Sequence, residues 1–401
     1  MITSVLCRFL KQLPVQLLIS IGSALFLGRN VDIYYISLSY TLSACFIEIL
    51  ISILPIIVFS FILKALFNLN KSAPFLLLII FLGITCSNLL ALTTGYFFGL
   101  FTLPYLGIQH APDFALSFSP SIKSLYSLNL PKLFSTEKAM LLGVILGVLM
   151  NYLNDQNFIK CKIKNITLYL SNGINIFLTK VFIPLLPLYV FGFCIKLSYE
   201  NMLIILFNQY GKVFLLSISL VIFYVFVLYI VGSKGQLKLE LSNLKIMIPA
   251  GLTAFSTMSS AATMPVTIKC TEEMTKEKSL SDLIIPSTAN IHMVGDDLTI
   301  VLTSLTLIAI FGLDIPDFKS FIPFALAFSF AKLSCVGLPG ASVLVVLPVL
   351  QNYLGFTNEM LSILTTIYIL QDSFGTSANV MGNGAFALII CRVCNFLKIT
   401  N

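Results

Sequence analysis

The stretch that decides the fold lies near the end of the chain and reads Gln371-Asp372-Ser373-Phe374-Gly375-Thr376-Ser377-Ala378-Asn379-Val380-Met381-Gly382-Asn383. The residues on both sides of it are as apolar as lipid, whereas the stretch itself carries a carboxylate, carboxamides, hydroxyls and two glycines. Polar groups of this kind are costly at bilayer depth unless a ligand, an ion or a partner satisfies them. The stretch therefore predicts a membrane helix with a functional site, in a chain that moves something polar across the membrane.

The composition of the whole chain agrees with a membrane protein. Of its 401 residues, 58% are hydrophobic and only 10% are charged, against about 25% charged in a soluble domain. This excludes a water-soluble fold. The formal charge of +7 could indicate a nucleic-acid partner, but the lysines and arginines are scattered between apolar runs instead of forming a basic face. We therefore expect a lipid bilayer as a partner and no nucleic acid.

Apolar segments recur along the first part of the chain. They cover roughly residues 13–28, 36–68, 74–105, 138–154, 172–197 and 202–232. Each is near or above the ~20 residues that a helix needs to cross ~30 Å of hydrocarbon, and the alternating strands of a membrane barrel are absent from the pattern. Polar loops are expected at 106–137 and around Lys160-Cys161-Lys162-Ile163-Lys164. The prediction is an all-α polytopic membrane protein with about eight transmembrane helices.

The basic residues also predict an orientation. With a cytoplasmic N-terminus, the cytoplasmic loops hold most of the lysines and arginines, for example Lys160 to Lys164 and Lys269 to Lys278, as the positive-inside rule requires. We therefore expect a multi-pass protein of the cell (inner) membrane with both termini in the cytoplasm. We interpret the first apolar segment as a spanning helix instead of a cleaved signal.

Two later segments depart from the simple pattern. Residues 244–275 are interrupted in the middle by polar residues 256–265, and residues 320–351 are interrupted by Gly337-Leu338-Pro339-Gly340-Ala341-Ser342. Each half is too short to cross a bilayer alone. Two re-entrant helical hairpins, which dip into the membrane and return, would account for both. Irregular backbone at that depth is tolerated only where protein buries it or where it lines a watery cavity.

Each hairpin is followed by a long apolar helix with a polar break. In residues 283–312 the break is Asn290-Ile291-His292-Met293-Val294-Gly295-Asp296-Asp297, and in residues 356–396 it is the stretch quoted first. Hairpin and broken helix thus occur twice. This predicts inverted repeats with a binding site near the membrane midplane between them.

With these motifs the chain resembles the dicarboxylate/amino acid:cation symporter family, which includes glutamate and neutral amino acid transporters. The resemblance is clearest in Ser259-Ser260-Ala261-Ala262-Thr263-Met264-Pro265-Val266-Thr267, which is similar to the serine-rich tip of the first hairpin, and in Gly337-Leu338-Pro339-Gly340, which is similar to the second tip. It implies a homotrimer in which residues 1–69 and 137–200 form a static scaffold and residues 70–136 and 201–401 form a moving transport domain. It also implies that residues 337–342 act as an outer gate.

The resemblance implies a substrate site on the opening stretch and the hairpin tips. The family pattern supplies an aspartate for the substrate ammonium, an arginine for a side-chain carboxylate, a threonine nearby and an asparagine for the α-carboxylate. These positions hold Asp372, Gly375, Thr376 and Asn379. The tips add Ser259, Ser260, Gly337, Pro339 and Gly340. An arginine grips a carboxylate through two charge-assisted hydrogen bonds, so its loss favours a neutral amino acid. The alternative is a carrier of glutamate or aspartate that recruits Lys332 for the side chain, or a dicarboxylate carrier.

The cation positions depart further from the family. His292-Met293-Val294-Gly295-Asp296 aligns with the family's Asn-Met-Asp-Gly-Thr, and Asn383 aligns with an aspartate. Val294 and Asn383 therefore stand where the family gives two carboxylates to sodium, and Asp296 and Asp297 are additional. The implied coupling set is His292, Met293, Asp296, Asp297, Asn379 and Asn383. Coupling is expected either through a proton on Asp296 or His292 or through sodium at Asn379, Asn383 and Asp296. No cofactor besides the co-transported sodium or proton is expected.

Other roles stay open for these residues. Ser259 and Ser260 could cap a helix end, Asp372 could form a buried pair with Lys332 or Lys180, and either additional aspartate could be structural. An intramembrane hydrolase would also use serine, histidine and aspartate at depth, but His292 is the one histidine in an apolar segment and the chain has no Gly-x-Ser-x-Gly motif. A channel is a third option. We expect a transporter and not an enzyme.

Overall fold

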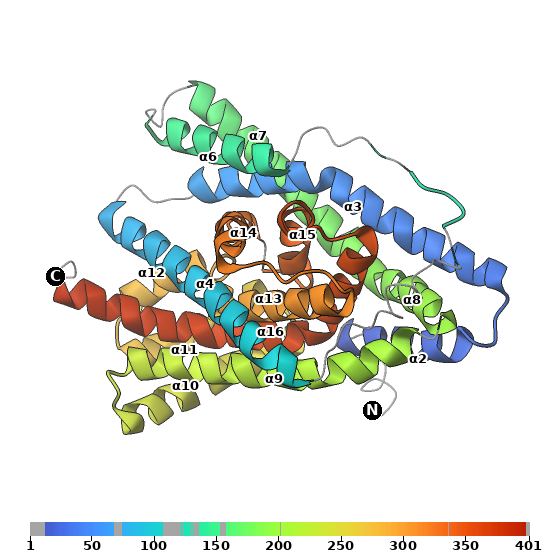
Figure 1. Cartoon of the computed structure of the whole chain (residues 1–401). Helices are drawn as coiled ribbons and strands as arrows, with labels where there is room; N and C mark the ends of the chain where they lie inside the picture. Colours follow the sequence, from blue (N-terminus) through green and yellow to red (C-terminus); the bar gives the residue numbers. More distant parts are fainter. Residues whose placement is uncertain are drawn as a thin grey trace, which may run out of the picture.

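The computed structural model describes residues 13–67, 74–106, 122, 124–128, 130, 136–152, 158–200, 202–335 and 337–397. Every regular element within these residues is a helix (Figure 1). In chain order the elements are α2 (Leu13–Leu27), α3 (Ile33–Phe67), α4 (Pro74–Thr102), η1 (Leu103–Leu106), α6 (Thr136–Tyr152), α7 (Phe158–Phe177), η2 (Leu178–Phe182), α8 (Ile183–Tyr199), α9 (Met202–Gly232), α10 (Leu237–Thr257), α11 (Ser260–Thr275), α12 (Lys278–Thr288), α13 (Val294–Ile310), α14 (Phe318–Lys332), α15 (Ala341–Leu354) and α16 (Asn358–Phe396). This confirms the predicted all-α class.

Long apolar helices indicate that lipid surrounds this protein. Four helical segments in the described part of the chain are long and apolar enough to span a membrane, namely Leu78–Leu106, Cys161–Tyr199, Tyr210–Gly232 and Asn358–Phe396. On α9, large apolar side chains such as Ile222 and Phe223 are about two-thirds exposed, at 65% and 64%. Such a surface is stable only when lipid or another chain covers it. The chain is therefore a multi-pass membrane protein.

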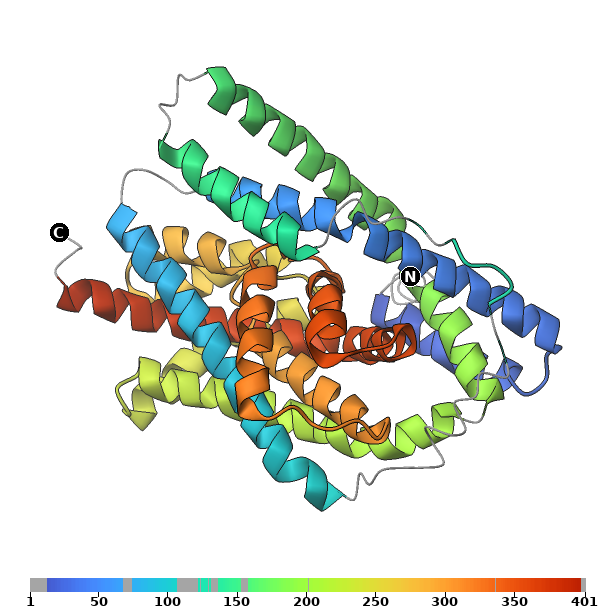
Figure 2. The same ribbon diagram turned by 45° about the horizontal axis from the view of Figure 1, so that its top comes forward.

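The helices pack in two groups, which both ribbon views show (Figures 1 and 2). In the first group α3 packs on α6, α7 and α8, and α2 packs on α8. In the second group α16 packs on α9, α10, α11, α12 and α13, and α4 lies against α13. The first group comes from the residues predicted to form the scaffold and the second from those predicted to form the transport domain. That one group moves against the other stays a prediction.

Two helical hairpins lie where the interrupted segments predicted them. In hairpin 1, α10 and α11 pack on each other and are joined by a turn at Met258, whose φ of 52° is left-handed. In hairpin 2, α14 and α15 pack on each other, and α15 begins after Gly340, whose φ of 73° is also left-handed. Glycine adopts this backbone conformation without the clash that a Cβ would cause. Whether the hairpins re-enter the membrane stays a prediction.

The predicted break in the helix after hairpin 1 is present, between α12 and α13. Backbone groups at a break need other partners when they are buried. Asn88 of α4 donates from its amide nitrogen to the carbonyl of Ile291 at 2.7 Å. At the start of α13, the backbone N–H groups of Gly295 and Asp296 donate to Asn379 Oδ1 at 2.8 and 3.2 Å. The break is thus held by side chains from α4 and α16.

Two expectations were wrong. The helix after hairpin 2 is not broken, because α16 is continuous over 39 residues. It contains no proline, and polar side chains such as Thr376 bond within the helix or to its neighbours, so nothing forces the backbone open. The basic run from Lys160 to Lys164 is not a loop, because it lies in α7. Lysine is a good helix former, and no proline or glycine interrupts this run.

Candidate functional site

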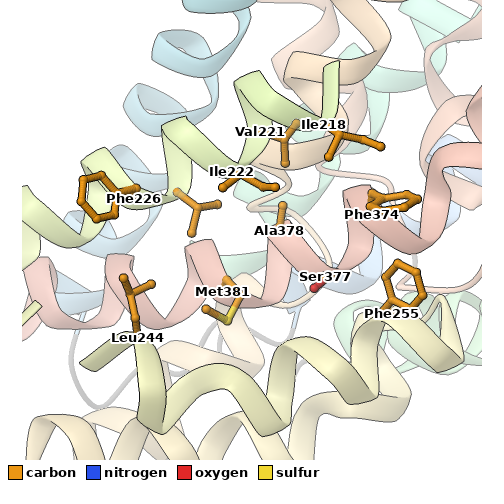
Figure 3. A pocket seen from close by; sticks show the side chains of 11 residues that line it. Ile218, Val221, Ile222, Phe226, Leu244, Phe255, Phe374, Ser377, Ala378 and Met381 are labelled. Carbon is orange, nitrogen blue, oxygen red and sulfur yellow. The ribbon is translucent and has the colours of Figure 1, made fainter. Parts of the chain in front are cut away.

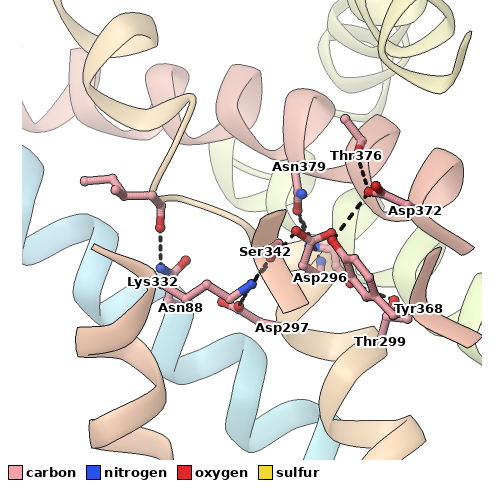
Figure 4. A network of polar contacts seen from close by, with 12 residues as sticks. Asn88, Asp296, Asp297, Thr299, Lys332, Ser342, Tyr368, Asp372, Thr376 and Asn379 are labelled. Carbon is pink, nitrogen blue, oxygen red and sulfur yellow. Dashed lines mark hydrogen bonds and ion pairs between the residues drawn. The ribbon is translucent and has the colours of Figure 1, made fainter. Parts of the chain in front are cut away.

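One face of α16 gathers the polar residues of the opening stretch. Tyr368, Asp372, Thr376, Asn379 and Asn383 follow one another at intervals of three or four residues, so they share a side of the helix. All five are buried. The first four face α13 and hairpin 2, as Figure 4 shows, and Asn383 faces His292 of the α12–α13 break. Burial of so many polar groups in one contact marks the central polar site of the molecule.

The opposite face of α16 is different in character. There α9, α10 and α16 surround a cavity of about 330 Å³, shown in Figure 3. Its lining is apolar except for Ser377, whose hydroxyl donates to the carbonyl of Gly251 at 3.0 Å. A polar substrate gains no hydrogen bonds in such a cavity and loses those to water. The polar face of α16 is therefore the side on which a polar substrate can form hydrogen bonds.

Asp372 connects α16 to the tip of hairpin 2. Its Oδ2 accepts the backbone N–H of Gly340 at 2.8 Å, and its Oδ1 accepts the hydroxyl of Thr376 at 2.7 Å and that of Tyr368 at 3.4 Å. These are the predicted substrate residues Asp372, Thr376 and Gly340 brought together. Because the carboxylate holds the tip directly, this conformation has hairpin 2 closed over Asp372.

The two hairpin tips and the α12–α13 break meet at Gly337. The hydroxyl of Ser259 donates to the Gly337 carbonyl at 2.5 Å, and the Gly337 N–H donates to Asn290 Oδ1 at 2.9 Å. Ser259 also caps α11 by accepting the N–H of Ala262. It therefore has the structural role that was left open, in addition to its contact with the second tip. A Cβ on residue 337 would lie 2.7 Å from Asn290 Oδ1, so the contact requires glycine.

The remaining tip residues lie nearby with fewer recorded contacts. Ser260 is buried as the first residue of α11. Pro339 is half-buried beside Gly340 in the turn before α15. Met293 is buried and immediately precedes α13, without capping it through its side chain. Ser260 and Pro339 thus lie at the hairpin tips and Met293 lies in the α12–α13 break, and their part in binding stays a prediction.

Asn379 is oriented by its hydrogen bonds. Only the oxygen of its amide can accept, and it accepts two N–H groups at the start of α13. The amide nitrogen therefore points away from these donors and is the atom that can donate to a substrate carboxylate. This geometry separates two roles that were expected of one residue, because the oxygen holds α13 and the nitrogen can bind the substrate.

Gly375 faces the carboxylate of Asp296. A Cβ on residue 375 would lie 2.7 Å from Asp296 Oδ1, and a Cβ on Gly295 would lie 2.5 Å from the Gly375 carbonyl. The two glycines let α13 and α16 approach closely. The place where the family resemblance expects an arginine therefore holds no side chain, and a carboxylate lies next to it.

His292 is buried in a network with α4 and α16. Its Nδ1 lies 2.7 Å from Asn383 Oδ1, and its Nε2 lies 2.8 Å from the hydroxyl of Ser87. The Asn383 oxygen can only accept, so Nδ1 carries a hydrogen, and in a neutral ring Nε2 accepts from Ser87. His292 and Asn383, two of the residues that depart from the family pattern at the cation positions, are thus bonded to each other. A hydrolase would need backbone N–H donors beside its serine to stabilise an oxyanion. Ser87 lies in the interior of α4, where the backbone N–H groups are already engaged in the helix.

Lys332 forms the charged part of the site. It is completely buried, and its Nζ lies 3.5 Å from Asp297 Oδ1 and 3.9 Å from Asp296 Oδ2. It also donates to the hydroxyl of Ser342 (Figure 4). The suggested pair of Asp372 with Lys332 is therefore wrong, since the lysine instead joins the two additional aspartates. Asp296, Asp297, Lys332 and Ser342 are called the Lys332 centre below.

Four of these participants were missed or misread from the sequence. Ser87 and Asn88 are adjacent polar residues within an otherwise apolar run of α4, which is a signal that could have been used. Tyr368 looks like an ordinary aromatic residue in an apolar helix. Lys332 is a lone lysine after an apolar run, and without the fold a lysine near a helix end suggests a side chain that reaches for the membrane surface.

These features define a class: a helical membrane transporter with two hairpins that close on a polar helix at the centre of the molecule. Residues 13–393 match the Sodium:dicarboxylate symporter family, and the chain belongs to that family. It is 27% identical over 209 residues to the serine/threonine transporter SstT of Streptococcus agalactiae serotype III, an alignment that covers 50% of this chain and 50% of the relative. The SstT of serotype Ia of the same species matches with the same identity and coverage.

The match spans about half the length of these curated relatives. Family membership points to a transporter and not to the hydrolase that was considered.

Proposed function

We propose that the protein is a secondary active symporter that carries a neutral amino acid into the cell, driven by a cation gradient through alternating access. The observation that carries this proposal is the pair formed by Gly375 and Asp296. A negative charge, and no arginine, lies beside the place expected for the substrate side chain. A substrate carboxylate there would be desolvated and repelled.

The backbone of an amino acid fits the groups on α16. The carboxylate of Asp372 would bind the ammonium, and the amide nitrogen of Asn379 would donate to the α-carboxylate. The start of α11 at Ser260 adds the positive end of a helix dipole close to the second tip. Because Gly340 now donates to Asp372, hairpin 2 has to release this bond before an ammonium replaces it. This supports hairpin 2 as the gate.

The relatives support a small polar side chain. They are named serine/threonine transporters, which makes serine and threonine the first substrates to test. The alternative of an acidic substrate held by Lys332 has less support. The ammonium already faces two carboxylates and Ser342, so it would have to leave both before binding a third.

The coupling cation is sodium or a proton. Of the oxygens expected to bind sodium, Asn379 Oδ1 and Asn383 Oδ1 already accept hydrogen bonds, whereas Asp296 Oδ1 has no partner among the described residues. Asp296→Asn tests the proton route directly. If the variant transports and keeps the full pH dependence of the wild type, Asp296 does not carry the coupled proton.

The assembly and orientation belong to the same proposal. We propose a homotrimer in the cell (inner) membrane, with both termini in the cytoplasm, in accordance with the positive-inside pattern of the sequence. Cross-linking in membranes would test the trimer, and labelling of single introduced cysteines from either side would test the orientation.

The decisive experiment is uptake into proteoliposomes. Purified protein is given labelled serine, threonine, alanine, glutamate or aspartate under an imposed sodium or proton gradient. We expect accumulation of the neutral amino acids above the external concentration. Strong uptake of glutamate with none of serine, alanine or threonine contradicts the neutral substrate, and equilibration without accumulation contradicts symport.

Asp372→Asn provides the site-specific arm of this experiment. A hydrogen bond to a charged group contributes about 1.5–3 kcal/mol, so its loss should weaken apparent affinity roughly 10- to 100-fold. The matched control is Asp317→Asn, because Asp317 is an exposed aspartate that caps α14, and asparagine caps helices as well as aspartate does. Its uptake should equal that of the wild type. If both variants lose uptake to the same degree, Asp372 has no specific role in binding the substrate.

A further inference from the structure

The Lys332 centre brings three charged groups together without exposing any of them to solvent. The side chain of Lys332 is 0% exposed, and those of Asp296 and Asp297 are 2% and 0% exposed. When both aspartates are ionised, two carboxylates and one ammonium leave a net negative charge in a buried place. Each buried charge is tolerated only when it is compensated by a partner of opposite sign. Without the ammonium, the two carboxylates would repel each other with no cation between them.

The unused oxygens of the centre describe what kind of group belongs there. Asp296 Oδ1 and Asp297 Oδ2 have no hydrogen-bond partner among the described residues, and Asp297 Oδ1 meets only the Lys332 ammonium, at 3.5 Å. The Ser342 hydroxyl adds a further oxygen, which now accepts from Lys332. Carboxylate and hydroxyl oxygens without N–H donors are ligands for a hard monovalent or divalent cation. The lysine ammonium stands at the position where such a cation would be bound.

The ammonium also ties parts of the fold that a gate must separate. Lys332 is the last residue of α14, Ser342 is in the first turn of α15, and the two aspartates are in the first turn of α13. Both arms of hairpin 2 are therefore joined through one cation to the helix that begins at the polar break. Moving hairpin 2 away from α13 would pull the positive charge out from between the carboxylates. The charge therefore favours the closed hairpin.

We propose that the Lys332 ammonium is a tethered cation that occupies this centre in place of free sodium, and that removing it converts the centre into a sodium-binding site. The wild-type protein then needs no sodium at this centre to close hairpin 2. The ion-binding part of the proposal stands on the Lys332 centre alone. Its meaning for coupling rests on the proposed function, since only a symporter has a cation to couple.

Thermal unfolding of the purified protein, in sodium chloride against choline chloride of equal ionic strength, tests this without any substrate. A ligand that binds only the folded state raises the melting temperature as its concentration rises. We expect no sodium-specific shift from the Lys332 centre in the wild type. Lys332→Met has a neutral side chain of similar length, and it should be less stable in choline and regain stability in sodium in a saturable manner.

Two further variants separate charge from damage to the fold. Lys332→Met combined with Asp297→Asn restores the net charge of the centre, and we expect it to be more stable in choline than Lys332→Met and to lose the sodium response that Lys332→Met gains over the wild type. Lys196→Met is the control for losing a buried lysine elsewhere. Lys196 is 2% exposed and lies 4.2 Å over the ring of Tyr40, and this variant should show the same difference in melting temperature between the two salts as the wild type.

The proposal is overturned by either of two results. One is a Lys332→Met protein that folds and shows no sodium-specific stabilisation. The other is a wild-type protein with a sodium-specific shift that Asp297→Asn abolishes, because sodium would then share the centre with the lysine. This second test also decides the matter if Lys332→Met fails to fold in both salts. If the melting temperatures behave as expected but the protein takes up no amino acid, the tethered cation is supported and the proposed function is contradicted.

Discussion

Gly375 has no side chain, and this leaves room for a residue of the neighbouring helix α13. The space beside it is filled by the Asp296 carboxylate of α13. The sequence predicted a functional site at Asp372, Thr376 and Asn379 through the family resemblance, and in the structure their helical spacing puts them on one face of α16. It did not predict that the Asn379 oxygen holds the start of α13, 84 positions away in the chain. Contacts between distant segments leave no local pattern.

Gly375→Ala should lower both stability and uptake. The new Cβ would lie 2.7 Å from Asp296 Oδ1, so the carboxylate has to move away from α16. Crowding of this kind costs about 1–3 kcal/mol. The control is Gly173→Ala in α7, where a Cβ meets no atom within 4 Å, and where alanine should stabilise the helix by about 0.5–1 kcal/mol. Chemical unfolding and uptake are measured for both. A Gly375→Ala protein that is stabilised as much as the control contradicts the contact.

Asn379→Ala should destabilise the protein through the start of α13. The backbone N–H groups of Gly295 and Asp296 would lose their acceptor in a buried place, at a cost of about 1–3 kcal/mol for a buried donor. Thr357→Ala is the comparison, because Thr357 caps α16 at an exposed end. Water replaces that cap, and we expect a loss of about 1 kcal/mol with normal uptake. If the two variants unfold alike and transport alike, the bonds to α13 do not matter.

At the scale of elements, the hydrophobic pattern predicted helices well and breaks less well. Apolar runs placed α2, α3, α4 and α9 within a few residues of their bounds. The polar stretch 371–383 was interpreted as a break, yet α16 is continuous there. Polar residues interrupt a hydrophobic run in the same way whether they open the backbone or only face another helix. A broken helix is distinguished from a continuous one by side chains that bond to the free backbone groups at the break, as Asn88 and Asn379 do. These side chains come from other helices, so the local sequence does not reveal them.

The turn before α15 gives a prediction for this element. Gly340 and Gly355 flank the helix, both with left-handed φ, of 73° and 66°. Alanine at either position pays about 1–2 kcal/mol of backbone strain. Only Gly340 also donates to Asp372. Gly340→Ala should therefore reduce uptake as well as stability, whereas Gly355→Ala, which is exposed, should reduce stability alone. Loss of uptake in both variants to the same degree would mean that strain in α15, not the tip contact, limits transport.

For the whole molecule, the division into two groups of helices follows from the contacts between them. Most helix contacts lie within a group, whereas few elements bridge the groups: α8 touches α9, α15 touches α3, α16 touches α2 and α14 touches α6. Where α3 and α15 meet, Ile57 of α3 and Leu344 of α15 line a small cavity. The sequence predicted the ranges of the two groups only through family resemblance. Apolar faces that meet lipid and apolar faces that meet protein look the same in composition.

A cross-link between the groups should stop transport if one group moves against the other. In a chain whose nine cysteines are replaced, Ile57→Cys with Leu344→Cys places two thiols at the bridging cavity. Mercury(II) should join them and abolish uptake, and a thiol reductant should restore it. The control pair is Ile62→Cys with Gly143→Cys, within the first group, where a Cβ at 143 lies 3.3 Å from the Ile62 Cβ. This pair should cross-link with no effect on uptake, because α3 and α6 stay together. Undiminished uptake by the cross-linked Ile57 and Leu344 pair would show that hairpin 2 does not leave α3 during transport.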